Sequence, residues 1–348
     1  MAKNLHKAKK AKKDEFYTQL PDIERELKHY KNHFKDKVVY CNCDDPRVSN
    51  FFHYFSYNFE KLGLKKLITT CYKSQNMDLF SQNNSEEAIY LEYEGDKNGN
   101  NIPDIEEIGI NYLRGDGDFR SDECIELLKL ADIVITNPPF SLFREYVSQL
   151  IEYEKSFIVI GNKNAITYKE IFKLIKENKI WIGNTPMGTD MLFDVSEDFA
   201  QKLISNKKEG SGYKIINGIV KARAQAVWFT NLDISKRHED LILYKKYNAE
   251  EYPKYENFNA IEVSKTANIP LDFSGFMGVP ITFLDKYNPN QFEIIGLAND
   301  KRLIDDAFVQ GNEIYLDEQH KKFVGMVLKE KNNLRATYAR IIIRNKRL

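Results

Sequence analysis

Short apolar runs alternate with longer segments of helical spacing over residues 37–183. Runs of five to seven residues without a helical period predict strands. The predicted strands are KVVYCN (37–42), KLITTCY (66–72), ADIVIT (131–136), SFIVIG (156–161) and KIWIG (179–183). ADIVIT does not alternate apolar and polar positions, which is typical of a strand covered on both faces.

The segments around these strands have apolar residues three and four apart, which predicts helices. They are DIERELKHYKNHF after Pro21, SNFFHYFSYNFEKLG (49–63), DECIELLKL (122–130) after Ser121, SLFREYVSQLIEYE (141–154) and YKEIFKLIKEN (168–178). Thr167 and Glu170 have the spacing of a capping box for the last helix. Strands and helices in alternation predict a Rossmann-like, doubly wound α/β sheet with helices on both faces.

The alternation of predicted strands and helices is interrupted in two regions of the chain. Residues 73–108 are rich in Asn and Gly, so we expect a loop or a poorly ordered hairpin there rather than core. After residue 184 the alternation fails, except that AQAVWFTNLD (224–233) predicts a last core strand. The expected organisation is a basic tail (1–13), an α/β domain (14–235) with a variable insertion (184–222), and a smaller, mostly β or irregular region (236–348).

Composition excludes several classes of protein. The 348 residues contain no apolar run long enough to span a membrane, and no apolar stretch follows the charged start that a secretory signal would need. We therefore expect a cytoplasmic protein with no membrane partner. Cys41 and Cys43 lack the second pair of ligands that a zinc site needs, and the six His residues form no spaced cluster, so no metal is expected.

Charge is balanced overall, with 51 basic and 51 acidic residues, but both ends are basic. Residues 1–13 hold six lysines and no acid, and seven Lys or Arg stand against one Glu from Lys329 onward. Such clusters can neutralise phosphates and give salt-sensitive affinity for nucleic acid. For the N-terminal tail alone, a solvated tail that aids solubility explains the lysines equally well.

Asn137, Pro138, Pro139 and Phe140 directly follow the strand ADIVIT. Two prolines can simply end a strand, because proline has no backbone N–H for the ladder. With Pro at about 5% of residues, such a motif is expected by chance in roughly one or two of a hundred chains of this length. In doubly wound sheets, ligands bind at the carboxyl ends of strands, where this motif is predicted to lie.

These residue types fit methyl transfer to the exocyclic amino group of a nucleobase. The Asn137 side-chain oxygen and the Pro138 carbonyl oxygen would accept the two amino hydrogens and favour a pyramidal nitrogen with an available lone pair. As positive charge develops on that nitrogen, the same oxygens stabilise it. Phe140 would stack on a base that has left the DNA helix.

Eight stretches along the chain form a recognisable set: DEFYTQ (14–19), VVYCNCDDPRVSNFF (38–52), GDGDFRS (115–121), DIVITNPPFSLF (132–143), NAITYKEIF (164–172), KIWIG (179–183), WFTNLD (228–233) and MGVPITFL (277–284). With them the sequence resembles the EcoRI-type adenine-specific DNA methyltransferases over nearly its whole length. The resemblance implies the methyltransferase form of the α/β fold, S-adenosyl-L-methionine as methyl donor, and adenine N6 in double-stranded DNA as acceptor. It also implies a restriction-modification system and a DNA-recognition role for residues 236–348.

The resemblance further implies roles for particular residues. The cofactor would be bound by Phe16, Tyr17, Thr18, Asn42, Cys43, Asp44, Asp45, Pro46, Asp118 and Phe119. The target base or DNA would meet Trp228, Phe229, Lys163 and Asn164. Without the resemblance, a Gly-rich turn explains Asp118 and Phe119, and a core strand or a plain turn explains the other four.

Two positions depart from the pattern of this fold. CDDPR stands after the first strand where Gly-x-Gly is expected for close backbone approach to the cofactor. Cys71 and Tyr72 stand at the end of the second strand, where an acid usually binds the ribose hydroxyls. The atoms that meet these parts of the cofactor therefore do not follow from the sequence.

Two other functions stay open from the residues. A methyltransferase of RNA or of protein glutamine uses the same motif on the same fold. A non-catalytic DNA-binding protein would explain the missing Gly-x-Gly, but it would have no need of an intact NPPF. We expect a monomer that treats one DNA strand at a time, with the insertion (184–222) a possible DNA contact.

Overall fold

A computed structural model describes residues 17–43, 49–70, 88–100, 102–104, 106–195, 197–298, 326–330 and 333–348. The chain forms two compact units. The first comprises Met1–Lys163 and Gly183–Leu232, and the second comprises Asn164–Ile182 and Asp233–Leu348. The short helical segment 164–182 thus groups with the C-terminal part of the chain, which the sequence pattern did not predict.

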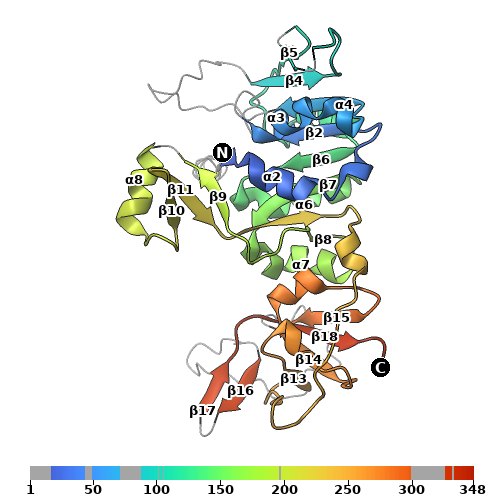
Figure 1. The fold of residues 1–348 in the computed structure, drawn as a ribbon, viewed down its shortest axis with the longest axis vertical. Coiled ribbons are helices and arrows are strands. Elements are labelled where there is room, and N and C mark those ends of the chain that lie inside the picture. The colour runs from blue at the N-terminus through green and yellow to red at the C-terminus, as the bar shows by residue number, and fades with distance from the viewer. Residues whose placement is uncertain are drawn as a thin grey trace. The chain divides into compact units, whose positions relative to one another are not determined.

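The first unit is built on a large mixed sheet (Figure 1). The strands that the first unit contributes to it run in the order β5-β4-β3-β2-β6-β7-β12. Their bounds are β2 (Val38–Asn42), β3 (Lys66–Thr70), β4 (Ile89–Tyr93), β5 (Gly109–Tyr112), β6 (Ile133–Thr136), β7 (Ser156–Asn162) and β12 (Ala226–Thr230). The central strands β3, β2, β6 and β7 are parallel, as the alternation predicts, and β12 is antiparallel to β7.

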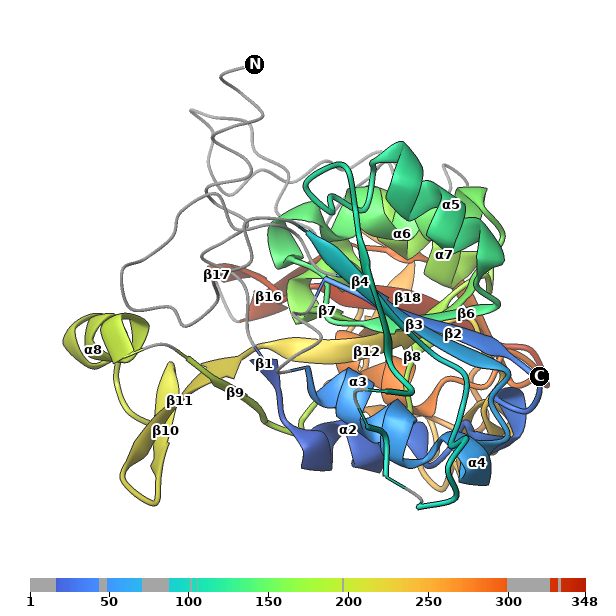
Figure 2. The same ribbon diagram turned by 90° about the horizontal axis from the view of Figure 1, so that it is seen from above.

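Helices cover both faces of this sheet (Figure 2). α2 (Leu20–Leu27), α3 (Asn50–Tyr57) and α4 (Phe59–Leu62) lie on one face, and α5 (Asp122–Leu130) and α6 (Phe143–Glu152) lie on the other. Ser49 and Ser121 cap α3 and α5 by accepting hydrogen bonds from backbone N–H groups three residues on. Gly63 ends α4 with a positive φ of 65°. The predicted α/β architecture is therefore confirmed.

Two local predictions were wrong. Residues 89–93 are not a loop outside the core, because β4 pairs with β3 and buries Ile89, Leu91 and Tyr93. The strand is antiparallel and alternates buried and half-buried residues, so it lacks the continuous apolar run of its parallel neighbours. Thr167 does not cap α7 (Lys169–Lys176): its hydroxyl donates to the Asn164 carbonyl, and Tyr168 occupies the N-cap position.

A second sheet of the first unit has the order β1-β9-β11-β10. The strands are β1 (Tyr17–Thr18), β9 (Met191–Asp194), β10 (Tyr213–Ile216) and β11 (Ile219–Ala224), and α8 (Glu197–Asn206) follows β9. We call β9, α8, β10 and β11, residues 191–224, the arm. The arm extends away from the large sheet to one side (Figures 1 and 2).

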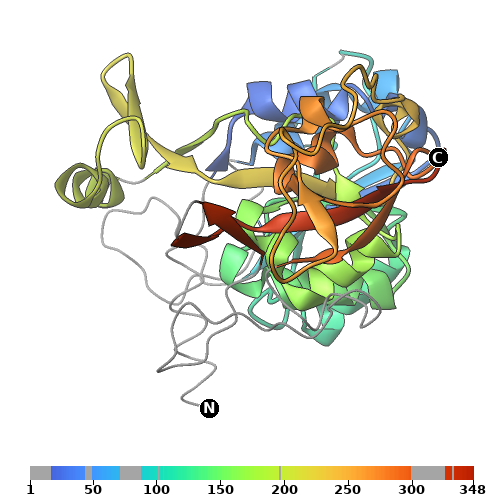
Figure 3. The ribbon, with the colours of Figure 1, turned by 90° about the horizontal axis from the view of Figure 1, so that it is seen from below.

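The second unit is mostly strands, as predicted. Its main sheet has the order β13-β14-β18-β15, and β16 and β17 form a two-stranded sheet. The bounds are β13 (Ala260–Glu262), β14 (Phe276–Pro280), β15 (Phe292–Leu297), β16 (Val327–Glu330), β17 (Asn333–Ala336) and β18 (Arg340–Asn345), with β8 (Trp181–Ile182) beside α7 in sequence. β18 (red) lies against β14 (orange) in Figure 3.

Three arginines of the basic C-terminus are paired within the second unit. Arg340 bonds Glu262 at 2.7 Å, Arg344 bonds Glu293 at 2.5 Å, and Arg347 bonds Asp240 at 2.8 Å. The first pair is the most buried and includes a hydrogen bond from Tyr255 to Glu262. A large part of the C-terminal positive charge therefore serves the fold. The lysine tail (1–13) lies outside the described residues.

None of the helices in the described ranges combines the length and the apolar content needed to cross a bilayer.

Candidate active site

The carboxyl ends of β2 and β6 are joined by buried hydrogen bonds to Asn42. β2 and β6 are parallel neighbours, with Tyr40 opposite Val134. The Thr136 hydroxyl donates to the Asn42 carbonyl, and the Tyr146 hydroxyl donates to Asn42 Oδ1. Asn42 is 5% exposed, and the other two are fully buried. The points at which the chain leaves β2 and β6, after Asn42 and after Thr136, are thus held beside each other.

Tyr146 lies on α6 and was not predicted as a site residue. Burial raises the pKa of its hydroxyl well above the usual 10, so the group stays a neutral donor. Its ring also packs edge-on against Phe119, with centroids 5.0 Å apart. Tyr146 therefore connects the loop after β2 with the turn that carries Asp118 and Phe119. In sequence it reads as an ordinary apolar position of an amphipathic helix, so periodicity gives no signal of this contact.

The Asn-Pro-Pro-Phe segment leaves the buried edge of the sheet toward solvent. Asn137 and Pro138 are buried, whereas Pro139 and Phe140 are half-buried. The Pro139 carbonyl accepts from Leu142 N at 2.9 Å and starts η3 (Phe140–Leu142). Among the described residues, none donates a hydrogen bond to the Pro138 carbonyl. That oxygen is available as an acceptor.

Phe143 anchors the far end of this segment. Its ring lies 5.0 Å from that of Phe229, centroid to centroid. A Cβ at Gly161 would come within 2.5 Å of the Phe143 ring, which real Cβ atoms do not tolerate. Gly161 on β7 is therefore required for Phe143 to seat against the sheet. The close packing of Phe143 of α6 on Gly161 of β7 therefore determines where the Asn-Pro-Pro-Phe segment ends.

Trp228 and Phe229 lie in the hydrophobic core. They are 1% and 0% exposed, and Trp228 packs edge-on against Phe51 with centroids 6.2 Å apart. Neither ring offers an exposed face for stacking on a base. This burial matches the core-strand interpretation, and the base site proposed below does not include these two residues.

Lys163 and Asn164 follow β7, as predicted. Lys163 N donates to the Gln225 carbonyl at 2.6 Å, which closes the end of the β7–β12 pair. Lys163 is half-buried and Asn164 is exposed. A contact of either side chain with a base or with DNA stays a prediction.

The residues predicted for the cofactor are described only in part. Phe16, Asp44, Asp45 and Pro46, and also Cys71 and Tyr72, lie outside the described residues. Tyr17 and Thr18 form β1, which pairs with Asp194 and Phe193 of β9. The Thr18 carbonyl accepts from Asn50 Nδ2 at 2.7 Å, which ties β1 to the start of α3.

Thr18 carries an unused polar group near the start of α3. Its side chain is 2% exposed, and its Oγ1 has no hydrogen-bond partner among the described residues. A buried hydroxyl without a partner is costly, so it marks a position where a ligand atom would be stabilised.

Cys43 has a left-handed backbone, with φ of 83°. Such a conformation is uncommon for a residue with a side chain and normal for glycine. Cys43 directly follows β2, in the loop where the Gly-x-Gly of this fold is expected. The glycine is missing from the sequence, but its backbone conformation is present.

Asp118 is held by Arg120. The Arg120 Nε and Nη2 donate to the two carboxylate oxygens at 2.8 and 2.6 Å. Burial acts to raise the pKa of Asp118, but the hydrogen bonds and charge of Arg120 outweigh it and lower the pKa below its usual value. Asp118 is therefore an ionised acceptor at neutral pH. Arg120 also bonds Glu145 of α6.

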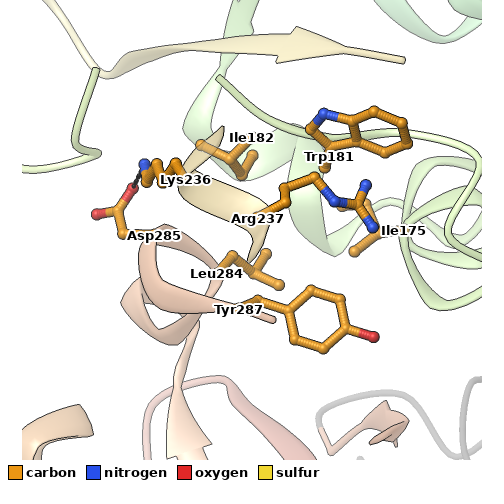
Figure 4. A pocket seen from close by; sticks show the side chains of 8 residues that line it. All are labelled: Ile175, Trp181, Ile182, Lys236, Arg237, Leu284, Asp285 and Tyr287. Atoms are coloured by element: carbon orange, nitrogen blue, oxygen red, sulfur yellow. Dashed lines mark ion pairs between the residues drawn. The ribbon is translucent and has the colours of Figure 1, made fainter. Parts of the chain in front are cut away.

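A pocket in the second unit holds a buried arginine (Figure 4). The Arg237 guanidinium lies 3.7 Å from the centre of the Trp181 ring and donates to Asn178 Oδ1 at 3.2 Å. Beside it, Lys236 pairs with Asp285. None of the residues predicted for the cofactor or the base lines this pocket. These contacts fasten the segments 175–182, 236–237 and 284–287 to one another.

Comparison with known proteins identifies the family of the chain. Residues 4–346 match the family model described as adenine-specific methyltransferase EcoRI. The chain belongs to this family and is an adenine-specific DNA methyltransferase.

Three relatives are similar to the methyltransferase over most of its length. Type II methyltransferase M.EcoRI of Escherichia coli is 49% identical, covering 99% of this chain and 97% of that protein. M.MgeORF184P of Mycoplasma genitalium is 40% identical over 89% of this chain and 92% of its own. M.MpnI of Mycoplasma pneumoniae is 39% identical over 95% and 99%. No solved structure matches the methyltransferase.

Proposed function

We propose that the methyltransferase moves the methyl group of S-adenosyl-L-methionine to N6 of an adenine extruded from double-stranded DNA. The observation that supports this most directly is the bonding of Asn42 to Thr136 and Tyr146. It holds the end of β2 beside the end of β6, where the Asn-Pro-Pro-Phe segment begins, and the family resemblance assigns the residues that follow β2 to the cofactor. A donor bound at one loop and an amino group bound at the other would be positioned for direct transfer.

The described residues are suited to bind S-adenosyl-L-methionine. The Asp118 carboxylate has room for a further hydrogen bond beside Arg120, since an ionised carboxylate offers about four lone-pair sites. It would accept from the adenine amino group of the cofactor. The Thr18 hydroxyl supplies a polar atom near the start of α3, and the left-handed backbone at Cys43 allows a close approach directly after β2. When bound, S-adenosyl-L-methionine supplies a methyl group made electrophilic by its positively charged sulfur.

Asn137 and Pro138 act on the target nitrogen. The Asn137 Oδ1 and the Pro138 carbonyl would accept the two amino hydrogens of the adenine. Their dipoles then face the nitrogen on which positive charge grows as the new N–C bond forms, and burial strengthens this interaction because little water screens it. After transfer the positively charged nitrogen is strongly acidic and gives its extra proton to water, so no strong base is required.

Phe140 is suited to hold the extruded base. Its side chain is half-buried at the start of η3, directly after the acceptor pair. An aromatic face contributes about 1 to 3 kcal/mol per stacked base, which offsets part of the cost of removing the adenine from the duplex.

A labelled-methyl assay tests this proposal. The full chain is incubated with radiolabelled S-adenosyl-L-methionine and with unmethylated DNA, total RNA or release-factor protein, and the products are digested and identified. We expect label in N6-methyladenine from DNA. Label only in RNA or in glutamine would contradict the proposal.

DNA as the substrate indicates the biological role of the enzyme. The three relatives are named type II methyltransferases, and we propose that this enzyme protects resident DNA in the cytoplasm as part of a restriction-modification system. We also propose that it works as a monomer, because each strand of a hemimethylated site can be treated in turn. Sedimentation of the enzyme with and without DNA checks this, and a stable dimer would contradict it.

A further inference from the structure

The arm ends in a hairpin whose tip is apolar and exposed. Asn217 and Gly218 form the turn, with φ of 51° and 79°, as a two-residue hairpin of the primed type requires. Ile216 and Ile219 flank the turn as a cross-strand pair and are 39% and 60% exposed. Ile215 beside them is 48% exposed. Exposed apolar side chains on a projecting hairpin favour association, so a partner surface is indicated.

The stem of the hairpin is rigid. Asp190 bonds Lys214 at 2.7 Å and also bonds Arg223, which links β10 and β11 at their base. β11 also pairs with β9, and β9 pairs with β1, the strand that carries Thr18. The tip is therefore held in a fixed relation to the cofactor side of the first unit.

Unpaired lysines stand at the base of the hairpin. Lys207 and Lys208 are exposed, and neither of them makes an ion pair within the described part of the chain. The Lys207 stem lies over Gly212, where a Cβ would come within 2.6 Å of it. β10 then runs for four residues to the tip, a distance of about 13 Å at ~3.3 Å per residue. Positive charge thus lies about 13 Å behind an apolar tip, so the tip can enter a groove about 8.5 Å deep while the lysines stay near the phosphates.

This combination fits the major groove of DNA. The major groove is about 12 Å wide and admits a two-stranded ribbon, while lysines beside it can reach phosphates. Isoleucine has no hydrogen-bonding group, so it can read only apolar features there. The apolar group that a base displays in the major groove is the C5 methyl of thymine.

We propose that the tip of the arm enters the major groove and that Ile216 and Ile219 contact thymine C5 methyl groups, so that the arm contributes to the choice of DNA sequence. The inference rests on DNA being the substrate. It extends the proposed function, because it assigns a base-reading role to residues outside the sheet edge.

The test compares two proteins on two DNAs. The first DNA is a duplex that the wild-type enzyme methylates, and the second is the same duplex made with deoxyuridine in place of thymidine, which removes only the C5 methyl groups. The variant is Ile216→Thr with Ile219→Thr, which keeps β-branched residues in the strands. We expect the wild-type enzyme to bind uracil DNA about tenfold more weakly than thymine DNA, and the variant to bind both DNAs equally weakly.

Matched controls make the outcome specific. Ile110→Thr changes an isoleucine of β5 that is 53% exposed, and it should bind both DNAs as the wild type does. Thermal unfolding verifies that the tip variant is folded. Wild-type affinity of the tip variant, or equal sensitivity of variant and wild type to uracil, would overturn the inference. So would a wild-type dimer that the tip substitutions dissociate, since the tip would then bind a second copy. If wild-type enzyme labels no DNA at all, the proposed function fails instead.

Discussion

The edge of the large sheet and the arm differ in whether their functional groups are buried and hydrogen-bonded or exposed to solvent. At the edge, the polar groups of Asn42, Thr136 and Tyr146 are buried and bonded to one another. On the arm, isoleucines are exposed at the tip, and Lys207 and Lys208 have no ion pair among the described residues. A catalytic edge needs dipoles fixed before the substrate arrives, because orienting them during the reaction would raise the barrier. A binding surface keeps its groups unsatisfied until a partner covers them.

The largest effect is expected at the edge. Asn137→Ala removes one of the two proposed acceptors of the amino hydrogens, so kcat should fall about 10²- to 10³-fold, as for loss of one preorganised dipole. Single-turnover methylation measures the effect, and filter binding should show DNA affinity close to wild type. If the variant keeps its turnover, the acceptor role of Asn137 is wrong and the contrast with the arm is lost.

Tyr146→Phe should have the next largest effect. It removes the hydroxyl donor to Asn42 Oδ1 and leaves this buried acceptor with only the weak Cys43 thiol bond at 3.6 Å, at a cost of about 1 to 3 kcal/mol. Urea unfolding measures the stability, and equilibrium dialysis measures the affinity for S-adenosyl-L-methionine, which should fall with it. Tyr153→Phe, on the C-cap of the same helix, serves as the control. Equal behaviour of the two variants would show that the network does not organise the edge.

Substitutions of Cys43 distinguish the effect of its backbone conformation from the effect of its thiol. Cys43→Gly should bind the cofactor as well as wild type, because glycine adopts the observed φ of 83° readily. Cys43→Val should lose stability by about 1 to 3 kcal/mol, since a β-branched residue is strained there. Thermal unfolding and cofactor titration of both variants check this. A Gly variant as impaired as the Val variant would instead indicate that the thiol is needed.

On the arm, Lys207→Gln with Lys208→Gln should weaken DNA binding uniformly across sequences. If both lysines contact phosphates, the slope of log K against log salt should flatten by about 2. Affinity measured between low and moderate salt tests this, with Lys61→Gln and Lys65→Gln, two exposed lysines of the first unit, as the control pair. A change in sequence preference with no change in slope would contradict a phosphate role.

The smallest effect is expected at Arg120. Because its hydrogen bonds lower the pKa of Asp118, the ionised carboxylate stabilises the folded state above its ordinary pKa of 3.8. This contribution is lost as pH falls through the lowered pKa. The ion pair is partly exposed, so it contributes less than about 1 kcal/mol. Urea unfolding of Arg120→Gln should differ slightly from wild type at pH 7 and converge with it in acid. A constant difference at all pH values would point to packing instead.

The sequence was most informative where one element is continuous and covered on both faces. Parallel strands of the large sheet carry uninterrupted apolar runs, so β2, β6 and β7 were predicted close to their observed bounds. β4 was missed because an antiparallel strand with alternating burial resembles its polar surroundings. Thr167 was misassigned because its hydroxyl bonds the Asn164 carbonyl, and a capping-box spacing does not reveal this competing contact.

The same limit applies to the candidate site. The assignment of Trp228 and Phe229 to the base rests on resemblance and stays a prediction, whereas their burial against Phe51 and Phe143, which are far away in sequence, comes from the structure. The arginines of the C-terminus looked like a nucleic-acid contact, but Glu262, Glu293 and Asp240 neutralise three of them. Composition counts charges and rings without their partners, so it cannot separate structural from exposed ones.

The sequence by itself determined the fold class, the family and the Asn-Pro-Pro-Phe segment, because these rest on local patterns and motifs. Only the tertiary structure decided that Tyr146 and Thr136 join the two loops through Asn42, that Cys43 takes the conformation of the missing glycine, and that the arm carries an exposed apolar tip beside unpaired lysines. The reason is physical. Hydrogen bonds, backbone strain and exposure depend on which distant residues meet, and a linear pattern does not contain that information.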